Sequence, residues 1–363
     1  MKRFICLIMI CMMMCGLFTA CGQEKHQLAI TGPSGVVYPY HDCVKFYLEA
    51  KNPNMQAYAV EGTNEKGDSS IKPVTISWMD DADTNVTKYV VEYGLKEDFS
   101  DAISVEKDST LDKKNVDVLN LYKASTYYVR VTAYAGEEML DQVSSTFQTT
   151  DLGPRIIKID GIHNVRDMGG YVTVDGKTTV QGLVYRGGEM DLVDGSVLLT
   201  EAGAAYMSDV LGIQTDLDLR GYPAKTPIPY AQKANVAINA YESAFTETEL
   251  YRQIFYLLAD EDNYPVYIHC AGGADRTGTV CYLLGALVGM TEEDLIRDYE
   301  FTSFSVYGLR SKYSESYKYP EFVARLKTYD GDTLQEKTEN YMLSIGVTPE
   351  EIENIRAIML GEY

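Results

Sequence analysis

The stretch HCAGGADRTG, residues 269–278, places a thiol, a guanidinium and several small residues close together. Arg276 follows Cys270 at a distance of six positions, and the turn between them carries adjacent glycines. Backbone amides of such a turn at a helix N-terminus can bind a phosphate dianion. The planar guanidinium of Arg276 can hold two of the phosphate oxygens. The spacing therefore predicts an anion-binding loop with a sulfur atom beneath the anion.

A thiol beside an arginine and a helix N-terminus ionises more readily than a free one. We therefore expect Cys270 to act as a thiolate that attacks phosphorus in line and forms a phosphocysteine. We expect Thr277 to hydrogen-bond the departing sulfur and His269 to order the loop rather than to act as a base. The residues expected to contact the phosphate are Ala271, Gly272, Gly273, Ala274, Asp275 and Arg276. The alternative is a buried structural cysteine that lies near a solvated arginine by chance.

A leaving alkoxide or phenoxide needs a proton, and two aspartates are candidates for the general acid. Asp275 lies in the loop itself. Asp218 lies near the end of a predicted strand in LGIQTDLDLR, residues 211–220, and ligands bind at the carboxyl ends of parallel strands. Each has a structural alternative, because Asp275 could cap the following helix and Asp218 could pair with a neighbouring arginine. The sequence leaves the choice between them open.

The elements around this stretch follow an α/β pattern. Residues 265–270 read as a strand, and residues 277–290 are apolar or small on all sides, as in a buried helix. Further helices are expected to begin at Thr246, with a capping box, and at Thr348, with proline at the first helical position. Residues 151–363 are therefore expected to form an α/β domain with a mostly parallel central sheet flanked by helices.

The preceding region has a different periodicity. Residues 74–78, 88–94 and 127–134 alternate apolar and polar side chains, with turn-forming residues between them. We see no helical period among them. Residues 22–150 are therefore expected to comprise a tether and an all-β sandwich, joined to the rest of the chain by the Gly-Pro linker at 149–155.

Residues 1–21 read as a targeting segment. Two basic residues precede an uncharged apolar run, and small residues lead into Cys21. The segment resembles a bacterial lipoprotein signal, which implies cleavage before Cys21 and lipid attached to it. A plain secretory signal and a retained membrane anchor are the alternatives. The expectation is a protein held outside the cytoplasm, with the membrane contacted only through this anchor.

Charge and composition exclude several classes of function. A formal net charge of −21 at pH 7 argues against nucleic acid as a partner, because such binding needs a basic field. Four histidines, with no CxxC or HExxH spacing, leave no obvious zinc site. Cys43, Cys270 and Cys281 are the only cysteines after Cys21, so no disulfide framework is expected. We expect no metal and no cofactor.

The stretch at 269–278 resembles the active-site loop of the protein tyrosine phosphatase superfamily, and its Asp-Arg pair resembles the bacterial tyrosine/serine phosphatases. NVRDMGGY at 164–171, the strand at 211–220 and EEDLIRDYEFTS at 292–303 are also similar to that branch. The resemblance covers about residues 155–363. It implies a pocket whose surroundings include Arg166, Asp167 and Arg186; we expect Arg220 to add further positive charge.

The resemblance implies a cysteine-dependent phosphatase that acts on a phosphorylated protein or a small phosphomonoester. This branch commonly has lysine where the sequence has Ala274, and that charge suits polyphosphorylated head groups. Its absence favours phosphotyrosine, or phosphotyrosine together with phosphoserine, or another simple monoester. The alternatives are an inositol phosphate or phosphoinositide phosphatase and a catalytically silent phosphate-binding surface module.

The β region resembles a fibronectin type III domain over about residues 27–150. Trp78 stands where that family keeps its core tryptophan. Leu121 and Tyr127 match its leucine and its corner tyrosine, whereas Lys123 replaces the proline that usually follows the leucine.

Overall fold

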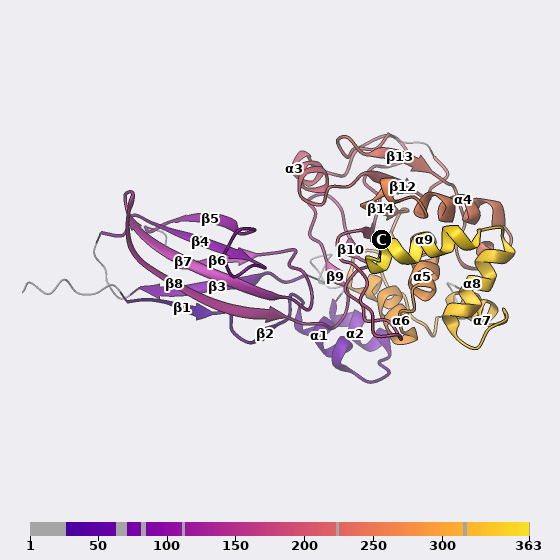
Figure 1. Ribbon diagram of the computed structural model, residues 1–363, viewed down its shortest axis with the longest axis horizontal. Helices are drawn as coiled ribbons and strands as arrows, with labels where there is room; N and C mark the ends of the chain where they lie inside the picture. Colours follow the sequence, from indigo (N-terminus) through magenta and orange to yellow (C-terminus); the bar gives the residue numbers. More distant parts are fainter. Residues whose placement is uncertain are drawn as a thin grey trace, which may run out of the picture.

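The computed structural model describes residues 27–62, 71–80, 85–110, 113–222, 225–314 and 318–362. The predicted targeting segment, including Cys21, lies outside these ranges. Within them, no helix is long and apolar enough to cross a membrane. The chain forms an elongated β region and a rounder region in which helices surround a sheet (Figure 1).

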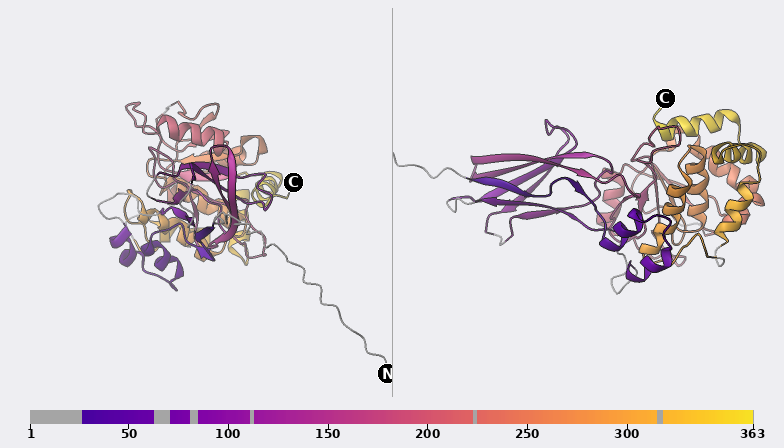
Figure 2. Two further views of the ribbon diagram at one scale, coloured as in Figure 1. Left: turned by 90° about the vertical axis from the view of Figure 1, so that its left-hand side faces the viewer. Right: turned by 90° about the horizontal axis from the view of Figure 1, so that it is seen from below.

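The elongated end of the molecule consists of two facing sheets with one shared core (Figure 2). The first sheet contains, in spatial order, β1 (Leu28–Gly32), β3 (Val74–Asp80) and β6 (Asn115–Val118). The second contains β2 (Val36–Val37), β8 (Glu138–Thr149), β7 (Thr126–Ala135), β4 (Lys88–Gly94) and β5 (Ile103–Asp108). Alternate residues of β3 and β7 are buried, as a period of two predicts.

Two helices interrupt this β region, so the expectation of an all-β region over residues 22–150 is wrong. α1 (Asp42–Glu49) and α2 (Met55–Gly62) lie between β2 and β3 in the chain. The buried residues of α1 recur at helical spacing and pack on the other half of the molecule rather than on the sandwich. The helices are short, and the surface that buries them lies much later in the sequence, so local patterning gave little sign of them.

The rounder region is built on a six-stranded sheet. Its strands, in spatial order, are β13 (Gln232–Asn235), β12 (Thr215–Asp218), β14 (Val266–His269), β11 (Val184–Gly187), β10 (Arg166–Asp167) and β9 (Arg155–Ile156). The first four run parallel, and β10 and β9 add antiparallel pairs at one edge. This mixed α/β architecture agrees with the expected mostly parallel sheet.

Helices surround this sheet (Figure 1). They are α3 (Glu201–Ala205), α4 (Thr248–Leu258), α5 (Arg276–Leu287), α6 (Glu292–Phe301), α7 (Tyr319–Leu326), α8 (Leu334–Ser344) and α9 (Pro349–Leu360). Nearly every residue of α5 is buried, which confirms the reading of its sequence as a helix without a solvent face. α5 follows β14 after a short loop, so the strand, glycine-rich turn and buried helix occur in the expected order.

Capping motifs in the sequence predicted one helix start correctly and another incorrectly. Thr348 begins α9 with a complete capping box to Glu351, as predicted. The capping box predicted at Thr246 is wrong, because α4 begins two residues later and has no side-chain cap. Glu247 instead accepts hydrogen bonds from the backbone and side-chain nitrogens of Asn239, at 2.8 and 2.6 Å.

Buried polar side chains join the sandwich to the α/β region. Lys123 Nζ donates to the carbonyl oxygen of Gly153 at 2.7 Å and lies 4.1 Å from the ring centre of Tyr171. Burial lowers the pKa of Lys123 to about 8. Arg155 stacks on the ring of Tyr122 at 3.6 Å. The joint is therefore held by specific polar contacts.

Candidate active site

The loop between β14 and α5 lies at the carboxyl edge of the parallel strands. His269, the last residue of β14, is in register with Gly187 on one side and Asp218 on the other. Cys270 follows directly and is only 3% exposed. The tertiary structure thus brings Cys270 and Asp218 to the same edge of the sheet, where parallel α/β sheets bind ligands.

The carbonyl oxygens of the loop are turned toward donors outside it. They accept from three different segments: Ala271 O from Glu189 N at 3.0 Å, Gly272 O from Asn164 Nδ2 at 2.8 Å, and Gly273 O from Arg186 Nη2 at 2.7 Å. Among the residues that the structure describes, the amides from 271 to 276 have no hydrogen-bond acceptor. These amides and the N-terminus of α5 are therefore available to an anion.

Glycine is required at one position of this loop. Gly273 has φ +64°, and a Cβ there would lie 2.2 Å from the carbonyl oxygen of Gly187. Gly272 is closely covered as well, because a Cβ there would lie 3.1 Å from the ring of Tyr307. The adjacent glycines thus allow β11 and the segment around Tyr307 to approach the loop backbone.

A buried cluster of two arginines and one aspartate supports the loop from below. Arg186 pairs with Asp298 through Nη1 while its Nη2 binds the loop. Arg166 binds the same carboxylate through Nε at 2.8 Å and donates to Asn164 Oδ1 at 2.6 Å. Burial alone would raise the pKa of Asp298, but the two guanidiniums hold it below its usual value. Arg166 thus contacts residues that hold the loop and does not contact the loop directly.

Asp167 lies on the side of the sheet that faces the sandwich. Its carboxylate accepts from Arg155 Nη1 at 3.0 Å and from the amides of Gly169 and Gly182 at 2.8 and 2.7 Å. Burial raises the pKa of Asp167. The structure therefore does not bring Asp167 to the loop. Its neighbour in the chain, Arg166, binds two residues, Asn164 and Asp298, that help to hold the loop.

Asp218 is a fully buried ion-pair partner. Its oxygens accept from Arg220 Nε and Nη2 at 2.8 and 2.7 Å and from Lys233 Nζ at 2.7 Å. Burial opposes ionisation, but these cationic donors hold the pKa of Asp218 well below its usual value. Arg220 also binds Asp191 Oδ1, so its charge is matched by carboxylates instead of facing a pocket.

Asp275 is held from two directions at the rim of the loop. Its Oδ1 accepts from Tyr241 Oη at 2.5 Å and from Arg310 Nε at 2.8 Å, and its Oδ2 accepts from Arg310 Nη2 at 2.9 Å. The side chain remains 31% exposed. It makes no capping hydrogen bond to α5, although Asp275 occupies the N-cap position. The capping alternative is therefore wrong for this carboxylate.

Three further predicted residues lie at the two ends of the loop. Arg276 donates from Nη1 to the carbonyl oxygen of Leu219 at 3.2 Å. Thr277 is fully buried, and its hydroxyl has no hydrogen-bond partner among the described residues. His269 Nε2 lies 2.8 Å from Asp216 Oδ1, which fixes the imidazole at the strand end. Of the other cysteines, Cys281 is buried inside α5, and burial raises the pKa of its thiol to about 11.

Sequence reasoning missed four residues around the loop. Asn164 lies two residues before Arg166 in one motif that resembles the family, and Asp298 lies in another, at 292–303. Membership of these motifs was the only available signal. Tyr241 and Arg310 lie in segments without a motif. Their role depends on the hydroxyl and guanidinium that reach Asp275 across the fold.

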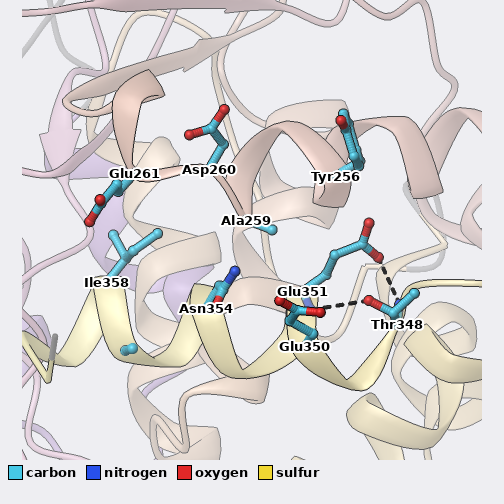
Figure 3. A pocket seen from close by; sticks show the side chains of 10 residues that line it. Tyr256, Ala259, Asp260, Glu261, Thr348, Glu350, Glu351, Asn354 and Ile358 are labelled. Carbon is cyan, nitrogen blue, oxygen red and sulfur yellow. Dashed lines mark hydrogen bonds between the residues drawn. The ribbon is translucent and has the colours of Figure 1, made fainter.

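A separate cleft of about 570 Å³ lies between the C-terminal end of α4 and α9 (Figure 3). Its lining includes Asp260, Glu261, Glu350 and Glu351, and none of its residues belongs to the loop. Carboxylates at such density repel a phosphate. The loop, rather than this cleft, is therefore the candidate site for an anionic substrate.

The α/β region is similar in sequence to known proteins. Residues 157–361 match the sequence profile of the tyrosine phosphatase family. A Cupriavidus necator protein with the provisional name of tyrosine-protein phosphatase is 24% identical over an alignment of 178 residues, with coverage of 40% of this chain and 63% of that protein. The chain thus spans less than two thirds of that relative's length.

Among solved structures, similarity extends to the core catalytic domain of the PP-IP phosphatase Siw14 from S. cerevisiae in complex with citrate. That match has 13% identity and a TM-score of 0.32 and covers 52% of this chain and 97% of that one. A second structure of the Siw14 catalytic core gives 14% identity, a TM-score of 0.30 and coverage of 52% and 96%. The profile match covers more than half of the chain, and the chain therefore belongs to the tyrosine phosphatase family.

Proposed function

We propose that the chain is a cysteine-dependent phosphomonoester hydrolase that works through a phosphocysteine. The observation that carries this proposal is the loop around Cys270, in which the carbonyl oxygens of residues 271–273 all accept from donors outside the loop. The loop amides and the N-terminus of α5 remain for a dianion. A phosphate bound there places its phosphorus next to the sulfur.

The reaction then has two balanced steps. In the first, the Cys270 sulfur forms a bond to phosphorus while the ester P–O bond breaks, and the leaving oxygen takes a proton from a nearby acid. In the second, water attacks phosphorus and the S–P bond breaks. The sulfur leaves as a thiolate, and the proton from water returns to the acid. The products are an alcohol and inorganic phosphate.

Arg276 and Thr277 are assigned to charge and sulfur stabilisation. The guanidinium of Arg276 has five N–H donors, and only one contact, to Leu219, is made within the described chain. The others can bind two phosphate oxygens. The unpartnered hydroxyl of Thr277 is buried at the start of α5, next to Arg276, which supports a hydrogen bond to the departing sulfur.

Asp275 is assigned to proton transfer in preference to Asp218. A proton donor must reach the leaving oxygen of the substrate, and Asp218 is fully buried with its carboxylate bound to Arg220 and Lys233. Asp275 lies in the loop itself and keeps part of its side chain exposed. Tyr241 and Arg310 fix its orientation.

A simple monoester, phosphotyrosine or phosphoserine in a protein, is the substrate class that the site favours. Ala274 is 1% exposed and contributes no charge to the loop. The cationic side chains of Arg186 and Arg220 are committed to buried carboxylates. The site therefore offers one guanidinium and one set of amides, which suits a single phosphate rather than several.

The proposal extends to the N-terminal half, which we regard as a fibronectin type III-like domain. Trp78 is buried and packs on Tyr89 with 5.3 Å between ring centres. The hydroxyl of Tyr127 accepts from the amide of Tyr122 at 2.8 Å, as a corner tyrosine does.

We further propose a lipid on Cys21 that anchors the protein outside the cytoplasm, supported by the composition of residues 1–21. Loss of membrane association in Cys21→Ser tests the anchor.

The hydrolase proposal is tested with purified protein and an aryl phosphate in the presence of EDTA. We expect hydrolysis that needs no added metal and is inhibited by vanadate. Phosphotyrosine peptides, phosphoserine peptides and phosphoinositides are then compared side by side. Hydrolysis of phosphoinositides alone would correct the substrate class. Phosphate binding without hydrolysis of any substrate would identify a silent binding module instead.

A further inference from the structure

The segment from 302 to 312, which follows α6, forms a wall of the loop. Thr302 Oγ1 accepts at 3.2 Å from Asn164 Nδ2, which also binds the loop carbonyl of Gly272. The ring of Tyr307 covers Gly272. Arg310 binds the Asp275 carboxylate through Nε and Nη2. The position of this segment therefore determines how the loop and its carboxylate are held.

Two side chains at the end of α6 fold this segment back on itself. Glu300 Oε1 accepts from the amide of Lys312 at 2.8 Å. Ser303 Oγ accepts from the amide of Arg310 and donates to its carbonyl oxygen, each at 2.8 Å. Arg310 is thus fixed at its backbone by Ser303 and, two residues later, by Glu300.

Glu300 is held in turn by a residue of α1. The hydroxyl of Tyr47 donates to Glu300 Oε2 at 2.5 Å, and both residues are fully buried. Burial raises the pKa of Glu300, and the hydrogen bond from Tyr47 opposes that change. Without the hydroxyl, a buried carboxylate oxygen would lose its donor, which is costly in the interior. The bond joins residues 253 positions apart.

Apolar packing fixes α1 against the same end of α6. The rings of Tyr47 and Phe304 meet edge to face at 5.6 Å between centres, and those of Tyr40 and Phe301 at 6.3 Å. These residues share one buried cluster, and α1 and α2 lie beside α6 in both views (Figure 1, Figure 2). Tyr47 lies outside residues 157–361, the part of the chain that matches the family.

We propose that Tyr47 is a positioning residue for the active site, acting through Glu300 to hold Arg310 against Asp275. The proposal rests on the proposed function for its catalytic meaning. It makes the helices inserted between β2 and β3 part of the catalytic unit. The N-terminal region, which the sequence predicted to be a separate tether and sandwich, thereby contributes to the shape of the substrate site.

The test uses Tyr47→Phe in the full chain, which removes the hydroxyl and keeps the ring. Tyr58→Phe is the matched control, because the Tyr58 ring packs on Tyr47 at 5.6 Å between centres. Tungstate binding is measured by calorimetry, and KM and kcat are measured with an aryl phosphate. We expect Tyr47→Phe to weaken tungstate binding and raise KM by about threefold or more, with little change in Tyr58→Phe.

A double-mutant cycle with Arg310→Ala separates positioning from general destabilisation. If Tyr47 acts through Arg310, Tyr47→Phe has little further effect on tungstate binding once Arg310 is truncated. Equal effects of Tyr47→Phe in both backgrounds, or equal results for Tyr47→Phe and Tyr58→Phe, would overturn the proposal. A wild type that binds tungstate but hydrolyses no substrate would refute the proposed hydrolase activity. The double-mutant cycle on tungstate binding would then still test the positioning role of Tyr47. A wild type that binds no tungstate would overturn both.

Discussion

Arg186 Nη2 donates a hydrogen bond to the carbonyl oxygen of Gly273 at 2.7 Å. The arginine is fully buried on β11, and the glycine lies in the turn that follows Cys270. The bond turns a loop carbonyl away from the sulfur, and Asp298 neutralises the same guanidinium. A cation that the family resemblance placed near the pocket thus serves the shape of the loop.

Replacing Arg186 should destabilise the α/β region. Arg186→Met leaves the buried Asp298 with one cationic partner, and we expect a loss of about 3 kcal/mol. Urea unfolding followed by circular dichroism at 222 nm measures it, because most helices lie in this region. The control is Arg130→Met in the sandwich, whose partly exposed pair with Glu92 should contribute less than about 1 kcal/mol. Comparable losses in both variants would contradict the buried-cluster argument.

Cys270→Ser should abolish turnover while keeping oxyanion binding. The substitution removes the nucleophile and leaves the loop amides in place, so kcat should fall by about 10⁴-fold or more. Stopped assays with an aryl phosphate and calorimetry with tungstate measure the two effects. Cys281→Ala is the control, because burial raises the pKa of that thiol and keeps it protonated. Retained turnover in Cys270→Ser would disprove the phosphocysteine route.

Gly273→Ala should eliminate phosphate binding, because its Cβ would lie 2.2 Å from the carbonyl oxygen of Gly187. The matched control is Gly195→Ala, which also has a positive φ, +85°, but has no atom within 4 Å of the new Cβ. It should cost only about 1 kcal/mol through backbone strain and leave tungstate affinity unchanged. If the two variants bind tungstate equally well, the close approach of β11 to the loop does not matter.

Asp275→Asn and Asp218→Asn should differ in their dependence on the leaving group. If Asp275 donates the proton, Asp275→Asn should lower kcat far more for an alkyl phosphate than for an aryl phosphate with a good leaving group. Asp218→Asn should lower both rates by a similar factor, because it disturbs the buried pairs with Arg220 and Lys233. Steady-state kinetics on matched substrates measures both. The reverse pattern would transfer the acid role to Asp218.

The stability of the protein should rise between pH 8 and 9.5 through Lys123. Burial lowers the pKa of Lys123 to about 8, below its unfolded value. Above pH 8 the folded state therefore releases this proton while the unfolded state still binds it, so stability increases with pH. The gain over this range should be about 2 kcal/mol. Unfolding free energies of wild type and Lys123→Met are compared across the range, and parallel pH profiles would rule the assignment out.

Local chemistry was sufficient to predict the loop and the elements that flank it. The glycine pair, Cys270 and Arg276 follow a strand and precede an apolar helix, and each of these signals lies within a few residues of the next. Thr348 shows the same for a helix start. Such features depend on neighbours in the chain, so a sequence reveals them.

The partners of the charged residues could not be predicted in this way. Asp218 was predicted as a candidate acid, but Lys233 reaches it from the adjacent strand and Arg220 from the following turn. Asp275 was predicted as a possible cap, but Tyr241 and Arg310 bind it from distant segments. The role of a carboxylate depends on which donors surround it, and the fold decides that.

The sequence by itself determined that a thiol, an arginine and a set of free amides would meet at a helix N-terminus, because strand, turn and helix signals are local. Only the tertiary structure decided how that loop is held. Arg186, Asn164 and the segment bearing Arg310 come from separate parts of the chain. Helix α1 joins them through Tyr47. Burial of polar groups requires partners at hydrogen-bond distance, and only folding brings such distant residues together.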